Sequence, residues 1–490
     1  MSWTRAIRIL YQATFLALFL WLLSSLASGD PRDLPYSAFH HADPLSATGV
    51  VLGTGTLPGA LIWSVALIAL TLVFGRVFCG WICPLGTLQQ VTSVVGRSRK
   101  ARASLSVNRY RRWYALKYYL LAVLLLLALG GSLQPGLLDP LSLTARGLAS
   151  GLWPVLPGGR PVPGGWVAFG LLLGILIASR FIPRLFCRGL CPLGALLGVF
   201  SRFALFRITR IEGNCTSCRL CAIDCQGADE PWGHHRVGEC HVCLNCVERC
   251  TPGAIEYRFL PPLPAPPPEP DLDRRLLLGS AIGAFAIAPV LRATGGGRDA
   301  AGPRTIRPPG ALAEAEFLER CVKCSLCQQV CPPGAIHPAL GQAGIEGIFT
   351  PVIVPRRGWC EFACTRCGEV CPTGAIARLT PARKTGYDGQ PPVRIGTAFI
   401  DRGRCLPWAS KTPCIVCEEM CPTSPKAIWF EEADEQSRDG RAIRLKRPIV
   451  EPGRCVGCGI CENKCPVGEQ AAITVSSVGE TRHPLNRMVL

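Results

Sequence analysis

Four long runs of apolar residues alternate with short polar segments in the first half of the chain. The runs cover residues 6–28, 58–78, 113–131 and 164–183. Each approaches the ~20 residues that an α-helix needs to cross the hydrocarbon core of a bilayer. The first run lacks the small-residue cleavage site of a signal peptide and is too long for one, so we expect it to remain as a helix. The pattern predicts a transmembrane block of four helices over residues 1–205.

Lysine and arginine are unevenly distributed among the segments that join these runs. They gather before the first run, between the second and third, and after the fourth. The remaining segments, 29–57 and 132–163, carry only Arg32, Arg146 and Arg160. Because basic loops stay on the cytoplasmic side of a membrane, both ends of the block and residues 86–112 are expected to face the cytoplasm.

Two motifs occur twice within the block. DPLS stands at 43–46 and again at 139–142, and the FCGWICPLG of 78–86 returns as FCRGLCPLG at 186–194. This order predicts two parallel copies of one helical hairpin, related by an approximate two-fold axis along the membrane normal. In DPLS, aspartate and serine are typical helix caps and proline favours the first helical turn. A proton relay through Asp43 and Asp139, beside His40 and His41, is the alternative.

The second half divides into two cysteine-rich domains and a linker. We place the first cysteine domain at 206–258, the linker at 259–311 and the second cysteine domain at 312–480. The linker opens with a proline-rich stretch at 259–273, which favours an extended spacer. Arg274 and Arg275 then begin a segment that ends near residue 292. Its apolar run is short for a span and suits a twin-arginine export signal, with a fifth transmembrane helix as the alternative.

Composition and charge narrow the classes of function. The chain of 490 residues has a formal net charge of +18 and 28 cysteines. Such a charge can indicate nucleic-acid binding, but the basic residues flank apolar runs, so we interpret them as topology signals and expect no nucleic-acid partner. Many cysteines can indicate a disulfide scaffold, but such scaffolds are usually small secreted domains. The spacing of the cysteines therefore decides between a disulfide scaffold and a set of metal ligands.

Six cysteine quartets, most of them close to CxxCxxCxxxC, contain all but four of the cysteines. The quartets are Cys215, Cys218, Cys221 and Cys225; Cys240, Cys243, Cys246 and Cys250; Cys321, Cys324, Cys327 and Cys331; Cys360, Cys364, Cys367 and Cys371; Cys405, Cys414, Cys417 and Cys421; and Cys455, Cys458, Cys461 and Cys465. Three thiolates on one tight loop can reach three irons of a cubane, whereas zinc ribbons use two separated CxxC pairs. We therefore predict six [4Fe–4S] clusters in α+β domains like bacterial ferredoxins.

The fourth cysteine of each quartet is expected to serve a neighbouring cluster, as in two-cluster ferredoxins. In the first domain this predicts that Cys250 joins the first quartet and Cys225 joins the second. In the second domain the spacing leaves the pairing open. A small-small-Ile element such as Gly334-Ala335-Ile336 follows most quartets and predicts a short strand that excludes water from the cluster.

On these motifs the chain resembles the NapH/NapG-type quinol dehydrogenase components and the MauN/MauM-like proteins, fused in one chain. Residues 1–258 resemble NapH, and residues 270–480 resemble NapG in FLERCVKCSLCQQVCPPGAI, TRCGEVCPTGAI and VEPGRCVGCGICENKCPV. The resemblance implies a multi-pass protein of the bacterial inner membrane that oxidises membrane quinol. Electrons would pass through the clusters to a periplasmic reductase or cytochrome. The twin-arginine segment of this chain departs from the family at Asp273, where Ser or Thr is usual, and at Leu277, where Phe is usual.

The same resemblance implies a side for each cysteine domain. Residues 206–258 would be cytoplasmic, and residues 312–480 would be periplasmic after export. A different overall function remains open: a membrane redox sensor or a metal-centre maturation factor. An energy-coupled pump is disfavoured, because the predicted helices are nearly free of acidic residues.

Cys79, Cys83, Cys187 and Cys191 are the cysteines outside the quartets. Residues at i and i+4 share one helix face, so each pair can provide two ligands. Both pairs are expected at cytoplasmic helix ends, where they could converge on one four-thiolate redox or metal site. The alternative is that each pair is reduced and structural, with Pro-Leu-Gly ending the helix. The histidines at 234, 235 and 241 are expected to be solvent-facing loop residues.

Overall fold

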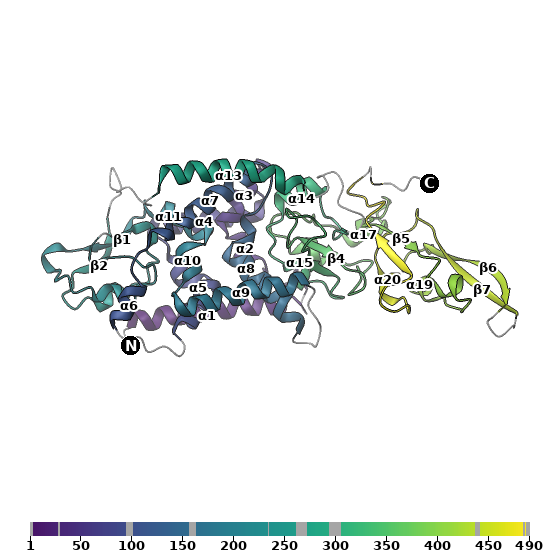
Figure 1. Ribbon diagram of the computed structural model, residues 1–490, viewed down its shortest axis with the longest axis horizontal. Coiled ribbons are helices and arrows are strands. Elements are labelled where there is room, and N and C mark those ends of the chain that lie inside the picture. Colours follow the sequence, from purple (N-terminus) through teal and green to yellow (C-terminus); the bar gives the residue numbers. More distant parts are fainter. Residues whose placement is uncertain are drawn as a thin grey trace.

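The protein has a helical centre with a cysteine domain at each end (Figure 1). The computed structural model describes residues 3–27, 30–94, 101–155, 163–233, 235–260, 272–293, 305–436, 442–483 and 486. Most of the proline-rich spacer predicted at 259–273 lies outside these ranges, as does His234. The first cysteine domain, with β1 and β2, and the second cysteine domain, with β6 and β7, lie at opposite ends of the long axis (Figure 1).

The helical block consists of long helices interrupted by short ones. Its first part contains α1 (Trp3–Ser25), α2 (Ala38–His41), α3 (Pro44–Thr54), η1 (Gly59–Ile62), α4 (Trp63–Phe74), the π-helical turn η2 (Phe78–Ile82) and α5 (Pro84–Val94). Its second part contains α6 (Ala101–Val107), η3 (Arg112–Ala115), α7 (Leu116–Leu129), η4 (Pro135–Leu137), α8 (Pro140–Arg146), η5 (Gly147–Leu152), η6 (Trp153–Val155), α9 (Pro163–Phe181), α10 (Leu185–Gly189) and α11 (Pro192–Ser201).

Among the described residues, four helices are long and apolar enough to cross a membrane. They are Trp3–Ser25, Ser104–Leu129, Pro163–Phe181 and Arg274–Leu291. Three of them correspond to predicted runs. The run at 58–78 instead forms a shorter apolar helix, Gly59–Phe74, because Gly75 adopts φ 75° and ends it. The second helix is therefore shorter than the predicted run.

The two DPLS motifs are helix caps, as predicted. The carboxylate of Asp43 accepts hydrogen bonds from the backbone N–H groups of Leu45 and Ser46, at 3.0 and 3.1 Å. Asp139 accepts one from the N–H of Ser142 at 2.7 Å. The prolines that follow occupy the first turns of α3 and α8. Both caps are buried, so these short helices begin inside the block and not at its surface.

The CxxxC pairs do not lie at the ends of the long helices. Gly75 separates η2 from α4, and Arg184, at φ 53°, separates α10 from α9. Nor does Pro-Leu-Gly end a helix: Pro84 and Pro192 begin α5 and α11. Since proline lacks an N–H that a first turn would leave unused, it favours this position. Each cysteine pair therefore sits on a separate turn between two helices.

The first cysteine domain is a small two-stranded unit. Strand β1 (Phe206–Arg210) pairs antiparallel with β2 (Ile255–Phe259), with Ile208 opposite Tyr257. Four short helical segments carry the cysteine loops between the strands: η7 (Glu212–Asn214), η8 (Leu220–Ala222), η9 (Val237–Glu239) and α12 (Asn245–Arg249). Its core joins Ile208 and Ile255 to buried cysteines.

The second cysteine domain contains two such units in succession. The first has α14 (Glu314–Arg320), α15 (Leu326–Gln329), β3 (Ile336–Pro338) paired antiparallel with β4 (Pro351–Ile353), α16 (Arg366–Glu369) and α17 (Pro381–Thr385). The second has β5 (Thr397–Ile400) paired with β8 (Ile473–Ser476), α18 (Leu406–Ala409), α19 (Val416–Glu419), α20 (Ile460–Lys464), and the hairpin of β6 (Ile428–Gln436) with β7 (Ala442–Val450). The separate cores of the two units are both rich in cysteine.

Helix α13 (Arg274–Ala293) runs along the block between the two domains (Figure 1). It lies against α7 and extends beyond the apolar run predicted for it. Its large apolar side chains are exposed, among them Leu278, Ile282 and Phe285. Large apolar side chains exposed along a helix of this length are suited to contact with lipid.

The second cysteine domain is seated directly on the far end of the block. A Cβ atom on Gly136 would lie less than 3.0 Å from the carbonyl oxygen of Val322. Arg146 donates to the carbonyl of Lys323 at 3.1 Å, and the ammonium of Lys323 donates to Gln134 at 2.6 Å. The backbones can therefore meet only because residue 136 has no side chain.

We expect Gly136→Ala to weaken this docking. The added methyl group must displace the backbone of Val322, and such overpacking costs roughly 1–3 kcal/mol. Thermal unfolding of the full chain in detergent should show a lower Tm. Gly170→Ala in α9 is the matched control, because a Cβ there meets nothing within 4 Å. Equal Tm values for the two variants would contradict the close contact.

Candidate iron–sulfur sites

Four cavities in the second cysteine domain are each lined by four cysteines. In every case three cysteines come from one quartet and the fourth from another. The sets are Cys321, Cys324, Cys327 with Cys371; Cys360, Cys364, Cys367 with Cys331; Cys405, Cys414, Cys417 with Cys465; and Cys455, Cys458, Cys461 with Cys421. The tertiary structure thus pairs the third quartet with the fourth and the fifth with the sixth.

The rest of each cavity wall suits a cluster that must be shielded from water. Small and branched apolar residues complete the walls, including Ala335 and Ile336 in one and Ala472 and Ile473 in another. Backbone N–H groups point at the sulfur atoms: Ala335 donates to Cys331 at 3.3 Å and Ala398 to Cys455 at 3.4 Å. Thiolates held by amide donors inside an apolar wall are the environment that [4Fe–4S] clusters require.

The first cysteine domain brings together the two sets that its spacing predicts. Electrostatic interactions connect Cys221 with Cys215, Cys218 and Cys250. They likewise connect Cys246 with Cys240, Cys243 and Cys225. The fourth cysteines are therefore exchanged in this domain as well.

Burial disfavours the thiolate form of several of these cysteines. It raises the pKa of Cys221 to about 11 and that of Cys417 in the second domain to about 12. A thiolate in an apolar site is unfavourable without a nearby cation. Cluster iron supplies such a charge when it is bound. The 28 cysteines are free thiols in the structure, so the quartets are available as ligands.

Both CxxxC turns contact the backbone of the second quartet's site. A Cβ on Gly80 would lie less than 3.0 Å from the carbonyl oxygen of His241, and Trp81 donates to the carbonyl of Val242 at 2.9 Å. On the other turn, Arg188 donates to the carbonyls of Cys225 and Gln226, both at 2.9 Å. The two turns therefore support the loops that carry Cys225, Cys240 and Cys243.

His241 is buried in this contact, so its expected solvent exposure is wrong. Burial, together with the guanidinium groups of Arg76 and Arg184, lowers the pKa of His241 well below its usual value. His235 is half-buried and pairs with Asp229. The loop position that suggested exposure is covered by the helical block, which sequence spacing could not indicate.

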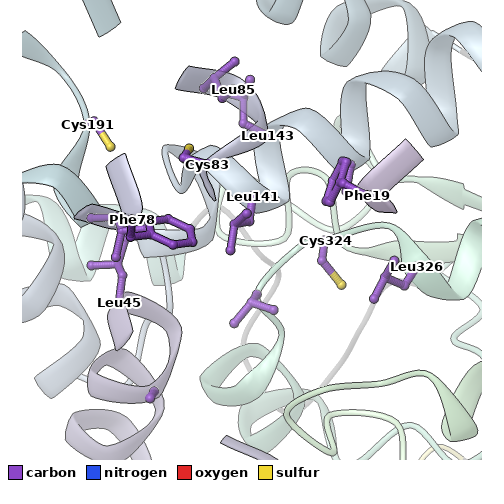
Figure 2. Packing of buried hydrophobic residues seen from close by; sticks show 14 of the residues in the cluster. Phe19, Leu45, Phe78, Cys83, Leu85, Leu141, Leu143, Cys191, Cys324 and Leu326 are labelled. Carbon is purple, nitrogen blue, oxygen red and sulfur yellow. The ribbon is translucent and has the colours of Figure 1, made fainter. Parts of the chain in front are cut away.

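At the opposite end of the block, a cysteine of the third quartet packs into the apolar core of the helices. Cys324 and Leu326 belong to one packed apolar cluster with Cys83 and Cys191. Figure 2 shows Cys83 and Cys191 on one side of this cluster and Cys324 on the other, with Leu141 between them in the view. Contiguous protein packing thus connects the CxxxC turns with the second cysteine domain.

Sequence reasoning missed a set of buried arginines at the CxxxC turns and the adjoining loops of the first cysteine domain. Arg8, Arg76, Arg184 and Arg188 are at most 1% exposed. Within the described part of the chain, none of them forms a salt bridge with a carboxylate; they donate to carbonyl, amide and sulfur groups. A signal was present: an arginine stands three residues before the first cysteine of each CxxxC pair.

Two family models match parts of the chain. One, described as a 4Fe-4S binding domain, matches residues 56–102 and again 164–210. Each of these segments contains one CxxxC pair. The other, described as a 4Fe-4S dicluster domain, matches residues 320–375, which span the third and fourth quartets.

Several curated proteins are similar over about two fifths of the chain. A methylamine utilization ferredoxin-type protein, MauM of Paracoccus denitrificans, is 36% identical over 194 residues, 39% of this chain and 78% of MauM. The regulatory protein NosR of Pseudomonas aeruginosa is 31% identical over 38% of this chain, which spans 25% of NosR. The putative electron transport protein YccM of Escherichia coli is 30% identical over 41% of this chain and 56% of its own length. No solved structure matches.

The exchange of fourth cysteines can be tested by thiol labelling of the full chain. In Cys371→Ser, we expect Cys321, Cys324 and Cys327 to become open to alkylation, because they share a cavity with Cys371. Cys360, Cys364 and Cys367 should stay protected. Cys331→Ser is the matched control and should give the reverse pattern. Labelling confined to the quartet that contains each substitution would refute the exchange.

Proposed function

The chain belongs to the family of the MauM ferredoxin-type proteins, and on that premise we propose that it oxidises membrane quinol and carries the electrons to a partner outside the cytoplasm. It is an iron–sulfur electron-transfer protein related to MauM, NosR and NirI. We assign the six quartets to six [4Fe–4S] clusters with exchanged fourth ligands. The protein itself supplies burial and hydrogen bonds to sulfur, which set the cluster potentials.

The observation that carries this proposal is the position of the two cysteine domains at opposite ends of the apolar block (Figure 1). With the block in a bilayer, the domains face opposite sides. Arginines 5, 8 and 188 line the end that holds the first cysteine domain. Because basic residues favour the cytoplasmic side, the first domain would be cytoplasmic and the second periplasmic.

Helix α13 supports export of the second domain with retention in the membrane. Its candidate span, Arg274–Leu291, begins at the end that holds the first domain and runs toward the second (Figure 1). A cleaved signal would not pack against α7, whereas a fifth transmembrane helix would. We therefore propose that Arg274 and Arg275 direct translocation and that α13 then remains as an anchor.

Quinol oxidation requires an electron acceptor and a proton acceptor at one place. Each quinol gives up two electrons and two protons to become quinone, and a cubane accepts one electron at a time. The electron acceptor would be the site with Cys324, which packs into the block. For the protons we propose His40 in α2, which contacts α8. Its imidazole is buried, and within the described chain neither ring nitrogen has a hydrogen-bond partner.

Topology tests the proposed sides. An alkaline phosphatase fused to the C-terminus should be active in cells, because the second domain would be periplasmic. A fusion after residue 258 is the matched control and should be inactive. Changing Arg274 and Arg275 to lysine should abolish the C-terminal activity if the twin-arginine route is used. No activity in either C-terminal fusion would place the whole electron path in the cytoplasm.

Quinol oxidation is tested in membranes that contain the full chain. Added quinol should bleach the iron–sulfur absorbance, and His40→Asn should slow this about 100-fold, as expected for loss of a proton acceptor. Reduction by dithionite should be unchanged. His41→Asn is the matched control, since His41 is already engaged by Ser37 at 3.0 Å; its effect should be less than about tenfold.

Two outcomes would count against these assignments. Equal slowing in both variants would remove His40 from the proton path. If quinol failed to reduce the unmodified protein, quinol oxidation itself would be overturned, and a membrane redox sensor or maturation factor would then explain the clusters.

A further inference from the structure

The four cysteines outside the quartets come together inside the helical block. Cys79 lies in the turn η2 and Cys83 follows it directly, while Cys187 lies in α10 and Cys191 caps the start of α11. Every one of these thiols is buried. Electrostatic interactions connect Cys191 with Cys187, Cys79 and Cys83. The Nη2 atom of Arg76 lies 3.9 Å from Sγ of Cys79 and also lies beside Gly194, whose N–H donates to Sγ of Cys191. The two pairs, about a hundred residues apart in sequence, therefore lie close to one another.

Two arginines each precede one cysteine pair in the sequence and reach the glycine that follows the other pair. Arg76 precedes the first pair, yet its Nη2 atom lies 2.8 Å from the position of a Cβ on Gly194, which follows the second pair. Arg184 precedes the second pair, and its Nη1 atom lies 3.7 Å from the corresponding position on Gly86, which follows the first. The exchange is reciprocal, which supports an approximate two-fold relation between the halves. A side chain at Gly194 would crowd Arg76, whereas a Cβ at Gly86 would be in ordinary van der Waals contact with Arg184.

Hydrogen-bond donors point at these sulfur atoms, as they do in the cysteine domains. The N–H of Gly194 donates to Sγ of Cys191 at 3.2 Å, and the amide of Gln89 donates to Sγ of Cys187 at 3.3 Å. In the quartets, Ala254 donates in the same way to Cys250 at 3.2 Å. Cys191 is followed directly by Pro192, and Cys250 is separated from Pro252 by one residue.

The charges at the site call for an anion. Arg76 and Arg184 are buried, and neither forms a salt bridge with a carboxylate in the part of the chain that the structure describes. The carboxylate that interacts with Arg76 is Glu239, and it is already paired with Lys117. A buried cation without a counter-charge of its own is strongly unfavourable. Four thiolates around iron and sulfide carry a net negative charge, which would balance the two guanidinium groups.

We propose that Cys79, Cys83, Cys187 and Cys191 together hold one iron–sulfur cluster, additional to those of the cysteine domains and shared between the two halves of the block. Each matched segment, 56–102 or 164–210, contains only one pair, so neither could supply four cysteine ligands alone. Two pairs on related turns suit either a [2Fe–2S] or a [4Fe–4S] core, in which each pair binds its own side.

The position of this cluster gives it a role in electron transfer. Gly80 lies between the first two cysteines and touches His241, while Arg188 lies between the last two and bonds to the carbonyl of Cys225. The site therefore adjoins the second quartet's loops. Toward the other end, it shares a packed core with Cys324. One electron would enter as a ferric ion becomes ferrous and would leave by the reverse step, with no bond made or broken.

The test is Cys191→Ser in the full chain, purified in detergent. Serine is a good helix N-cap and can still accept from Gly194, so the fold of α11 should be retained. We expect iron and acid-labile sulfide to fall by equal amounts, and Cys79, Cys83 and Cys187 to become the newly alkylated thiols. Thr71→Ser, which keeps its hydrogen bond to Leu67, is the matched control and should lose neither.

Three results would overturn the proposal: unchanged iron and sulfide, loss of zinc without sulfide, or a disulfide within a pair in the unmodified protein. A second variant separates a redox cluster from a structural one. Arg76→Gln should keep the iron content but shift one reduction potential to a more negative value, because a nearby cation favours the reduced cluster. Both tests read metal content, labelling or potential, so they stand even if quinol is not the electron donor.

Discussion

Close backbone approach at two glycines determines how the helical block meets its two cysteine domains. Gly80 allows the CxxxC turn to reach the carbonyl of His241, and Gly136 allows the block to reach the carbonyl of Val322. A methyl group at either position would separate the surfaces. Electron transfer between centres depends on short distances through packed protein, so the function proposed for the chain depends on these two contacts.

Charge is the second constraint on the assembly. The half of the block next to the first cysteine domain contains several buried guanidinium groups. They donate hydrogen bonds to backbone carbonyl groups in the cysteine loops, such as the carbonyl groups of Cys79 and Cys225. Each of these bonds holds a cysteine loop and places a positive charge beside cysteines for which we propose an iron–sulfur cluster. The arginines thus connect the membrane block with the iron–sulfur chemistry, both mechanically and electrostatically.

Much of the candidate site follows from local sequence. The six quartets, the DPLS caps and the strands that begin at Ile255, Ile336, Ile428 and Ile473 were predictable, because tight loops, caps and short strands depend on neighbouring residues. The length of the second helix was not, since the apolar run hides a break at Gly75. His241 was misjudged for a related reason: its burial comes from Gly80 and Trp81, more than a hundred residues away.

The sequence by itself determined which cysteines can act together on one loop, where helices can begin, and which segments are apolar enough for a membrane. These properties arise from spacing and from the chemistry of single residues. Only the tertiary structure decided that Cys371 shares a cavity with the third quartet and that Arg76 and Arg184 each reach the opposite half of the block. It also decided that the four thiols of the two CxxxC pairs lie close together. Each of these depends on how distant segments pack, and no local pattern encodes which segment will arrive at a given surface.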